Sequence, residues 1–117
     1  MLSFTNHVQI YLCTSPTDML RSFDGLSALV ASVMNHDPVS GHLFLFLNRR
    51  RDRIKLLYWD HDGLAIWMKR LEAGTFETPQ AAAGQACLEL DATQLTLLLS
   101  GVSLQSVKRR KRYALPR

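Results

Sequence analysis

The sequence predicts an α+β domain in which one long helix packs on an antiparallel sheet of three or four strands. The chain has 117 residues, of which 47% are hydrophobic and 21% charged, the composition of a single globular domain. Apolar residues recur at steps of three and four between positions 17 and 35, the spacing of a helix with one buried face. Three apolar runs follow, separated by turn-like segments, as expected for an antiparallel meander.

The first two predicted elements are a strand and the long helix. Residues 7–13 alternate apolar and polar side chains with the period of two expected for a half-buried strand. The helix is predicted over residues 17–35, where Ser15 or Thr17 can cap its start and Pro16 suits its first turn.

The meander is predicted from residues 42–47, 54–59 and 64–68. Residues 48–52 and 60–63 form its two turns. Both alternating sets of side chains in these strands are largely apolar, so both faces of the sheet must be covered, and the first helix can cover one of them.

The predicted C-terminal elements are a short edge strand at residues 88–90 and a small helix at residues 95–99. Asp91 is placed to cap this helix, and Gly101 follows its last apolar turn.

Positive charge is concentrated at the C-terminus. The net charge is +4, and the last ten residues contain six basic residues and no acid. Subtracting these six charges leaves residues 1–107 at −2. We therefore divide the chain into a single α+β domain, residues 1–107, and a flexible basic tail, residues 108–117. Such tails usually bind phosphate or an acidic partner surface.

The sequence gives no reason to expect a membrane protein. Its most hydrophobic stretches, residues 43–47 and 95–99, are five residues long, whereas a membrane span needs about 18. Residues 1–13 lack the basic start and sustained apolar core of a secretory signal. A cytoplasmic protein without a membrane partner is the expectation.

The second basic feature is the predicted hairpin turn at residues 48–55. Five of seven residues from position 49 to 55 are basic, and charges at a tight turn project into water, where they can reach a phosphate backbone. A solvated loop that prevents strand-edge aggregation is the alternative. The candidate nucleic-acid contacts are Arg49, Arg50, Arg51, Arg53, Lys55, Lys69 and Arg70 in the domain, and Lys108, Arg109, Arg110, Lys111 and Arg112 in the tail.

Two further motifs contain residue types that could carry chemistry. Asp60-His61-Asp62-Gly63 could suggest a metal-dependent nuclease, but the same residues suit a turn between strands, with Gly63 at a positive φ. No further acidic cluster supplies more metal ligands. The aromatic residues of the meander could stack on bases, but core packing is the preferred interpretation for Phe44, Phe46, Tyr58, Trp59 and Trp67.

Cysteine chemistry is not expected either. Cys13 and Cys87 are too few for a disulfide framework and too far apart for a short metal-binding knuckle, so they are interpreted as small buried hydrophobes. Neither a nucleophile elbow nor a glycine-rich phosphate loop is present in the sequence. We expect no catalytic residues, no metal and no cofactor.

An ordered series of short motifs resembles a known family, the TnpB-type accessory proteins of the bacterial insertion-sequence family numbered sixty-six, which are distinct from the RNA-guided nucleases of the same name. The resemblance covers residues 8–76, and residues 95–101 resemble the family's closing leucine-rich helix. The motifs are Arg21-Ser22-Phe23-Asp24-Gly25-Leu26, Gly41-His42-Leu43-Phe44, Asn48-Arg49-Arg50, Lys55-Leu56-Leu57-Tyr58-Trp59-Asp60, Asp62-Gly63 and Trp67-Met68-Lys69-Arg70-Leu71-Glu72.

The resemblance implies a small protein encoded beside a transposase that assists movement of the element without catalysing strand transfer. Together with the two basic features, it predicts a non-catalytic accessory protein that binds DNA, the transposase of the same element, or both. One alternative is a protein-interaction module that forms a homodimer through a sheet face or docks on the transposase. A metal-dependent nuclease centred on Asp60, His61 and Asp62 is the other.

Overall fold

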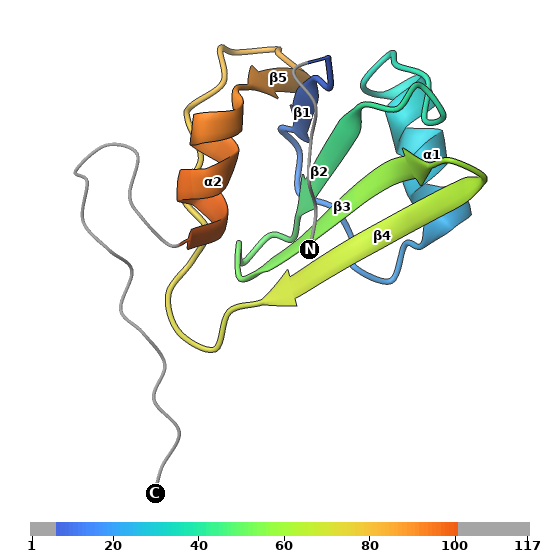
Figure 1. Cartoon of the computed structure of the whole chain (residues 1–117). Helices are drawn as coiled ribbons and strands as arrows, with labels where there is room; N and C mark the ends of the chain where they lie inside the picture. The colour runs from blue at the N-terminus through green and yellow to red at the C-terminus, as the bar shows by residue number, and fades with distance from the viewer. Residues whose placement is uncertain (1–6, 101–117) are drawn as a thin grey trace, which may run out of the picture.

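The computed structural model describes residues 7–100, which form a five-stranded sheet and two helices (Figure 1). The α+β class is therefore confirmed, while the predicted tail with Lys108, Arg109, Arg110, Lys111 and Arg112 lies outside the described residues. The elements in chain order are β1 (Ile10–Cys13), α1 (Phe23–Ser32), β2 (Leu43–Leu47), β3 (Arg53–Asp60), β4 (Gly63–Arg70), β5 (Cys87–Leu90) and α2 (Ala92–Ser100).

The sheet is mixed, with the strand order β4-β3-β2-β1-β5. The predicted meander β2-β3-β4 is antiparallel throughout, and β5 pairs antiparallel with β1. β1, however, pairs parallel with β2, so the prediction of a purely antiparallel sheet of three or four strands is wrong in both strand direction and strand number. The reason is that α1 lies between these two strands in the chain, and a helical crossover returns the chain in the same direction.

The first helix is shorter than the predicted span of residues 17–35, because its first predicted turns are held in another conformation. The Asp18 carboxylate accepts a hydrogen bond from the Leu20 N–H at 2.9 Å, and the Thr17 N–H donates to the carbonyl of Leu47 at 2.8 Å. Side-chain carboxylates that bond the backbone two residues on favour a turn over a helix. Neither Ser15 nor Thr17 caps α1; Ser22 stands at its N-cap without a side-chain hydrogen bond.

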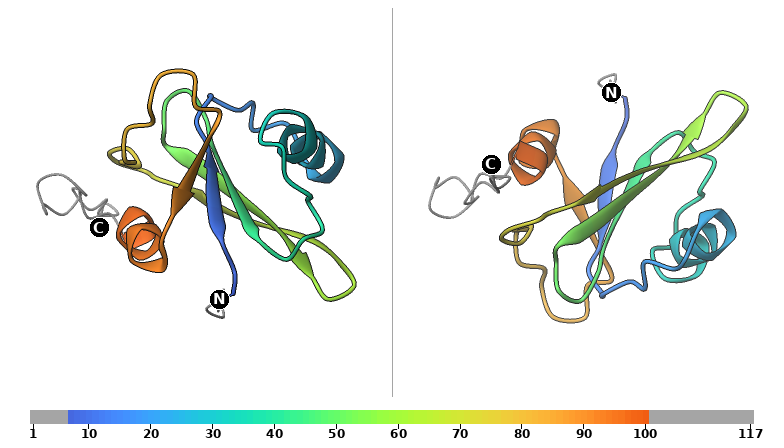
Figure 2. Two further views of the ribbon diagram at one scale, coloured as in Figure 1. Left: turned by 90° about the horizontal axis from the view of Figure 1, so that it is seen from above. Right: turned by 90° about the horizontal axis from the view of Figure 1, so that it is seen from below.

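The two helices lie on opposite faces of the sheet (Figure 2). On one face, α1 covers a cluster built from Cys13, Leu26, Val30, Met34, Phe44, Phe46 and Leu57. On the other face, α2 and the loop before β5 cover a cluster built from Ile10, Leu12, Leu43, Leu45, Leu47, Ile54, Leu56, Phe76, Leu90, Leu95 and Leu98. The expectation that both faces must be covered is confirmed, and the apolar alternation on both sides of each strand is its cause.

Helix α2 begins with a reciprocal cap, as its sequence predicts. The Gln94 N–H donates to the Asp91 carboxylate at 2.7 Å, and the Asp91 N–H donates to the Gln94 side-chain oxygen at 2.9 Å. This exchange satisfies two backbone donors at the start of the helix. Within residues 7–100, no helix is long and apolar enough to cross a membrane.

Candidate nucleic-acid interface

Asn48 organises the turn between β2 and β3. Its side-chain oxygen accepts hydrogen bonds from the N–H groups of Asp52 and Arg53, both at 3.0 Å. Its side-chain amide donates to the Asp52 carboxylate at 2.6 Å, and its carbonyl accepts from the Arg51 N–H at 3.0 Å. Four bonds from one residue fix the backbone on which the successive arginines stand.

The arginines of this turn face different directions. Arg49 and Arg50 are exposed, and Arg51 adopts the left-handed conformation with φ 60°. The Arg51 guanidinium donates to the hydroxyl of Thr78, and its carbonyl accepts from the Phe76 N–H at 2.7 Å. The turn is therefore braced against the loop that precedes β5.

An open hollow of about 590 Å3 lies beside the turn, on the face of the sheet that α1 covers. Three arginines line it together with the segment that precedes α1 and the end of β4. We call it the arginine hollow; its lining residues are Pro16, Thr17, Asp18, Met19, Leu20, Asn48, Arg49, Arg50, Arg53 and Met68. Leu20 is 90% exposed and Met68 is 48% exposed, so its rim also offers apolar contact area.

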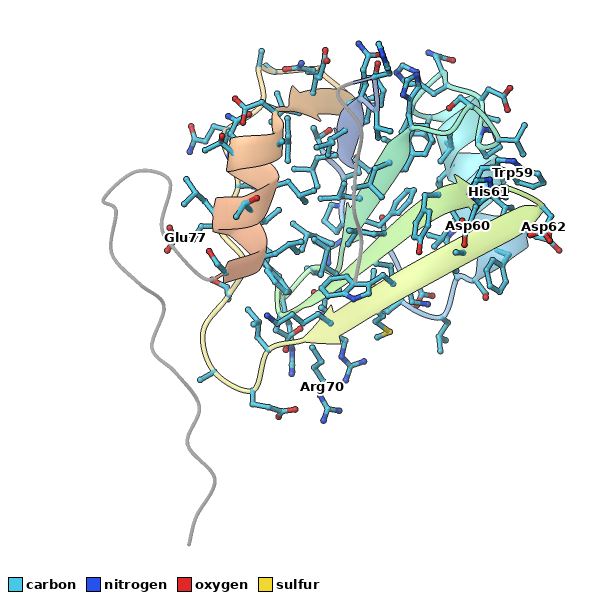
Figure 3. All side chains as sticks on the ribbon, viewed as in Figure 1. Trp59, Asp60, His61, Asp62, Arg70 and Glu77 are labelled. Atoms are coloured by element: carbon cyan, nitrogen blue, oxygen red, sulfur yellow. The ribbon has the colours of Figure 1, made fainter. Side chains whose placement is uncertain are left out.

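Arg70 adds a fourth guanidinium on the same face. It is the cross-strand partner of Arg53, and cross-strand partners point to the same side of a sheet. Arg70 is exposed and forms an ion pair of 2.8 Å with Glu72. Figure 3 shows Arg70 at one end of the β3–β4 hairpin and Asp62 at the other, so positive and negative charges are separated along the hairpin.

A second hollow of about 410 Å3 lies on the other side of the turn. Arg49 borders both hollows, and Arg51 borders only this one. Its walls include the end of β1 at Cys13 and the residues that follow Thr78. The turn thus carries guanidinium groups along both of its sides.

Lys55 does not belong to this exposed surface. Only 9% of it is exposed, and its ammonium donates to the carbonyls of Met19 and Arg21 at 2.7 and 2.8 Å. In β3 it stands opposite Phe46 of β2 and points toward the α1 face, so the strand period carries it inward. Lys55 thus holds the segment that precedes α1, and its ammonium is engaged within the domain.

Lys69 is also engaged within the domain. It stands opposite Ile54, so it lies on the face that α2 covers rather than beside Arg53. Its ammonium donates to the carbonyl of Leu99 at 3.1 Å, in the last turn of α2. A cation at this position satisfies a terminal carbonyl and interacts favourably with the helix dipole.

The acidic motif at residues 60–63 forms the turn between β3 and β4. The Asp62 N–H donates to the Asp60 carbonyl, and His61 adopts φ 56°. The expectation of a positive φ at Gly63 is wrong, because His61 takes that conformation and Gly63 opens β4. Within residues 7–100, no three His, Cys, Asp or Glu side chains are grouped so as to hold a metal ion.

The aromatic residues of the meander are divided between the two cores. Phe44 and Phe46 are fully buried beneath α1. Tyr58 and Trp67 pack on the cluster of the opposite face. The interpretation as core residues is confirmed for these four side chains, whereas Trp59 is half-buried and belongs to neither cluster.

Two features of the site were not predicted from the sequence. The segment of residues 16–20, which forms one wall of the arginine hollow, was predicted to begin a helix. Asn48 was included only as a turn residue, although an asparagine before a run of arginines is itself a signal for side-chain bonds to the following backbone.

Comparison with known proteins agrees with this arrangement of motifs. The chain matches the family described as "IS66 Orf2 like protein" over residues 8–109. Two similar proteins come from Sinorhizobium fredii (strain NBRC 101917 / NGR234). The uncharacterized protein y4jC is 34% identical over 110 residues, which cover 94% of this chain and 92% of the relative. The uncharacterized protein y4hO is 33% identical over 102 residues, which cover 87% of each chain.

No solved structure was found to match the chain. The family match spans most of the sequence and agrees with the resemblance carried by the short motifs from residue 21 to residue 72. The chain therefore belongs to the IS66 Orf2-like family of insertion-sequence-associated proteins.

Proposed function

We propose that this protein is a non-catalytic accessory factor of transposition that binds the DNA backbone of its element through the arginine hollow, Arg51, Arg70 and the basic tail. The observation that carries the proposal is the gathering of Arg49, Arg50 and Arg53 around one open hollow, with Arg70 beside them. Lys55 and Lys69 are not included, because their ammonium groups are bonded within the domain. Lys108, Arg109, Arg110, Lys111 and Arg112 add charge from the tail.

The chemistry of the hollow favours phosphate over base edges. Guanidinium groups bind phosphate oxygens with two parallel hydrogen bonds, and contacts of this kind carry no sequence information by themselves. The hollow is open to solvent, so that a nucleic-acid backbone can reach its arginines, and Asn48 fixes the backbone of the turn that carries two of them. We expect binding that depends strongly on salt and weakly on sequence.

The test compares variants of the full chain on two labelled duplexes, one from an element end and one unrelated. The triple variant Arg49→Gln, Arg50→Gln, Arg53→Gln removes three charges from the hollow. For this variant, the slope of log affinity against log salt concentration should become less steep by about three units on both duplexes. The matched control is Lys69→Gln, which removes a charge from the opposite sheet face and should leave binding nearly unchanged.

An unchanged salt slope in the triple variant would reject direct DNA contact by the hollow. A loss of affinity restricted to the element end would instead mean that these arginines read bases. Fluorescence anisotropy titrations at several salt concentrations measure both the affinity for each duplex and the salt slope.

Docking on the transposase is the second candidate, and the apolar rim of the hollow favours it. Leu20, at 90% exposure, and Met68 stand beside the arginines, a combination suited to an acidic protein segment with apolar side chains. A pull-down with the transposase tests this, because Leu20→Gln should weaken protein binding and leave DNA binding intact. We do not propose a dimer through a sheet face, since α1 and α2 cover both.

A further inference from the structure

Cys13 and Cys87 lie directly opposite each other in the antiparallel pair of β1 and β5. They are the two cysteines of the chain, and both are free thiols. The topology of the sheet thus brings together two residues that are far apart in sequence. Because both side chains point to the face that α1 covers, their sulfur atoms share one side of the sheet.

The hydrogen bonds around this pair define its geometry. The Thr14 N–H donates to the carbonyl of Ala86 at 3.2 Å, so the next pair along the ladder is a hydrogen-bonded one. Pairs alternate in antiparallel strands, which makes Cys13 and Cys87 a non-hydrogen-bonded pair. Cα atoms in such pairs lie about 4.5 Å apart, within the range of about 4.4 to 6.8 Å that disulfides adopt. A disulfide therefore fits this register without a change of strand pairing.

The two thiols differ in access. Cys13 is 4% exposed, and its sulfur lies 3.7 Å from the carbonyl of Ser15. Cys87 is half-buried and can meet a small reagent. Burial raises the pKa of the Cys87 thiol, and the neighbouring Cys13 and Glu89 add to the effect. Oxidation should therefore be slow at neutral pH, with Cys87 reacting first.

We infer that Cys13 and Cys87 form a reversible intramolecular disulfide when the protein meets a small-molecule disulfide such as oxidised glutathione. In the first step the Cys87 thiolate attacks one sulfur of the oxidant, forms a mixed disulfide and releases one glutathione thiolate. The Cys13 thiolate then attacks the Cys87 sulfur and releases the second glutathione. Both protein thiols are oxidised, one glutathione disulfide is reduced to two thiols, and the protons pass to the released thiolates.

The bridge would fasten β5 to the interior of the sheet. β5 is a four-residue edge strand that leads directly into α2, the helix that covers one face of the sheet. Local opening of a short edge strand costs little free energy compared with global unfolding. A covalent link at Cys87 would suppress this opening and hold α2 in place. The inference depends on the sheet register and is independent of the proposed DNA binding.

The test treats the reduced, folded full chain with oxidised glutathione at mildly alkaline pH. Intact mass should show the loss of two hydrogen atoms without added glutathione, and dithiothreitol should restore the reduced mass. Amide hydrogen exchange in β5 should slow by about tenfold or more in the oxidised protein. In the variant Cys13→Ala, a stable glutathione adduct should accumulate on Cys87, because no second thiol can displace it.

Three results would overturn the inference. One is a wild-type protein that keeps glutathione on Cys87 while Cys13 stays a free thiol. Another is a product consisting of disulfide-linked dimers. The third is an internal disulfide that forms in urea but not in the folded protein. The wild-type mass alone separates these results, so the conclusion does not depend on whether a cysteine variant folds.

Discussion

Arg53 and Arg70 face each other directly across β3 and β4. Like charges in this position destabilise a sheet, and within the described residues the carboxylate of Glu72 pairs with Arg70 at 2.8 Å. A bound anion such as a phosphate would relieve the repulsion between the two guanidinium groups. The pair is thus a small cost to the free protein, and in the proposed interface it would contact a negatively charged ligand.

The first prediction concerns this pair. Arg53→Gln should raise the free energy of unfolding by about 0.2 to 1 kcal/mol, because the opposed charge is removed. The same change should lower DNA affinity and reduce the salt slope by about one unit. Urea denaturation and anisotropy titrations measure the two effects. Lys69→Gln is the control for the DNA titrations, and an Arg53→Gln variant that is both less stable and unchanged in DNA binding would contradict the assignment.

For Lys55 we expect a substitution to lower the stability of the protein and to leave DNA binding unchanged. Lys55→Met keeps most of the side-chain volume but leaves the carbonyls of Met19 and Arg21 without their donor. The free energy of unfolding should fall by about 1 to 3 kcal/mol, the cost of unsatisfied buried polar groups. The DNA salt slope should not change once the folded fraction is known. A stable variant with a reduced slope would return Lys55 to the DNA-binding surface.

The turn between β3 and β4 gives a third prediction. His61 has φ 56°, whereas Gly63 has ordinary strand geometry and open space around the position of an added Cβ. His61→Val should therefore destabilise the protein by about 1 to 2 kcal/mol, while Gly63→Ala should be tolerated. Thermal unfolding of the two variants side by side tests this. Equal losses of stability would mean that the turn does not depend on the conformation of residue 61.

The basic tail gives the fourth prediction. Deletion of residues 108–117 should leave the thermal unfolding midpoint nearly unchanged, because the segment has no apolar periodicity. If its five clustered charges neutralise phosphates, the salt slope should fall by about 4 to 5 units. Anisotropy titrations at several salt concentrations measure the slope. A slope equal to that of the full chain would remove the tail from the proposed interface.

Local patterns in the sequence predicted most of the strands and the second helix. The apolar runs and turn-like segments in residues 42–68 predicted the meander, and Asp91 predicted the start of α2. Each of these depends on residues close together in the chain. The parallel pairing of β1 with β2 and the pairing of Cys13 with Cys87 depend on residues far apart, and no local pattern encodes them.

Only part of the candidate site could be predicted, because some of its contacts also join residues that are far apart in the chain. Arg49 and Arg50 are exposed because they lie in a turn, where side chains project into water, and the turn itself could be predicted from the sequence. Lys55 is also a basic residue, but its position in β3 directs its side chain toward the core. There its ammonium donates hydrogen bonds to carbonyls that are distant in the sequence. Strand parity alone would have indicated an inward direction, since Lys55 shares a side with Leu57. Its partners on residues 19 and 21 could not be read from the sequence.

The place of β1 between β2 and β5 has a consequence for synthesis. Of the five described strands β1 is synthesised first, and one of its edges stays unpaired until β5 emerges, after the meander is complete. Until then the nascent chain carries an open strand edge containing Ile10 and Leu12, and the sheet face beneath α2 is bare. Such edges pair readily with other chains. Translation that stops before residue 87 should therefore yield aggregating fragments, and a chain that includes β5 and α2 should aggregate less.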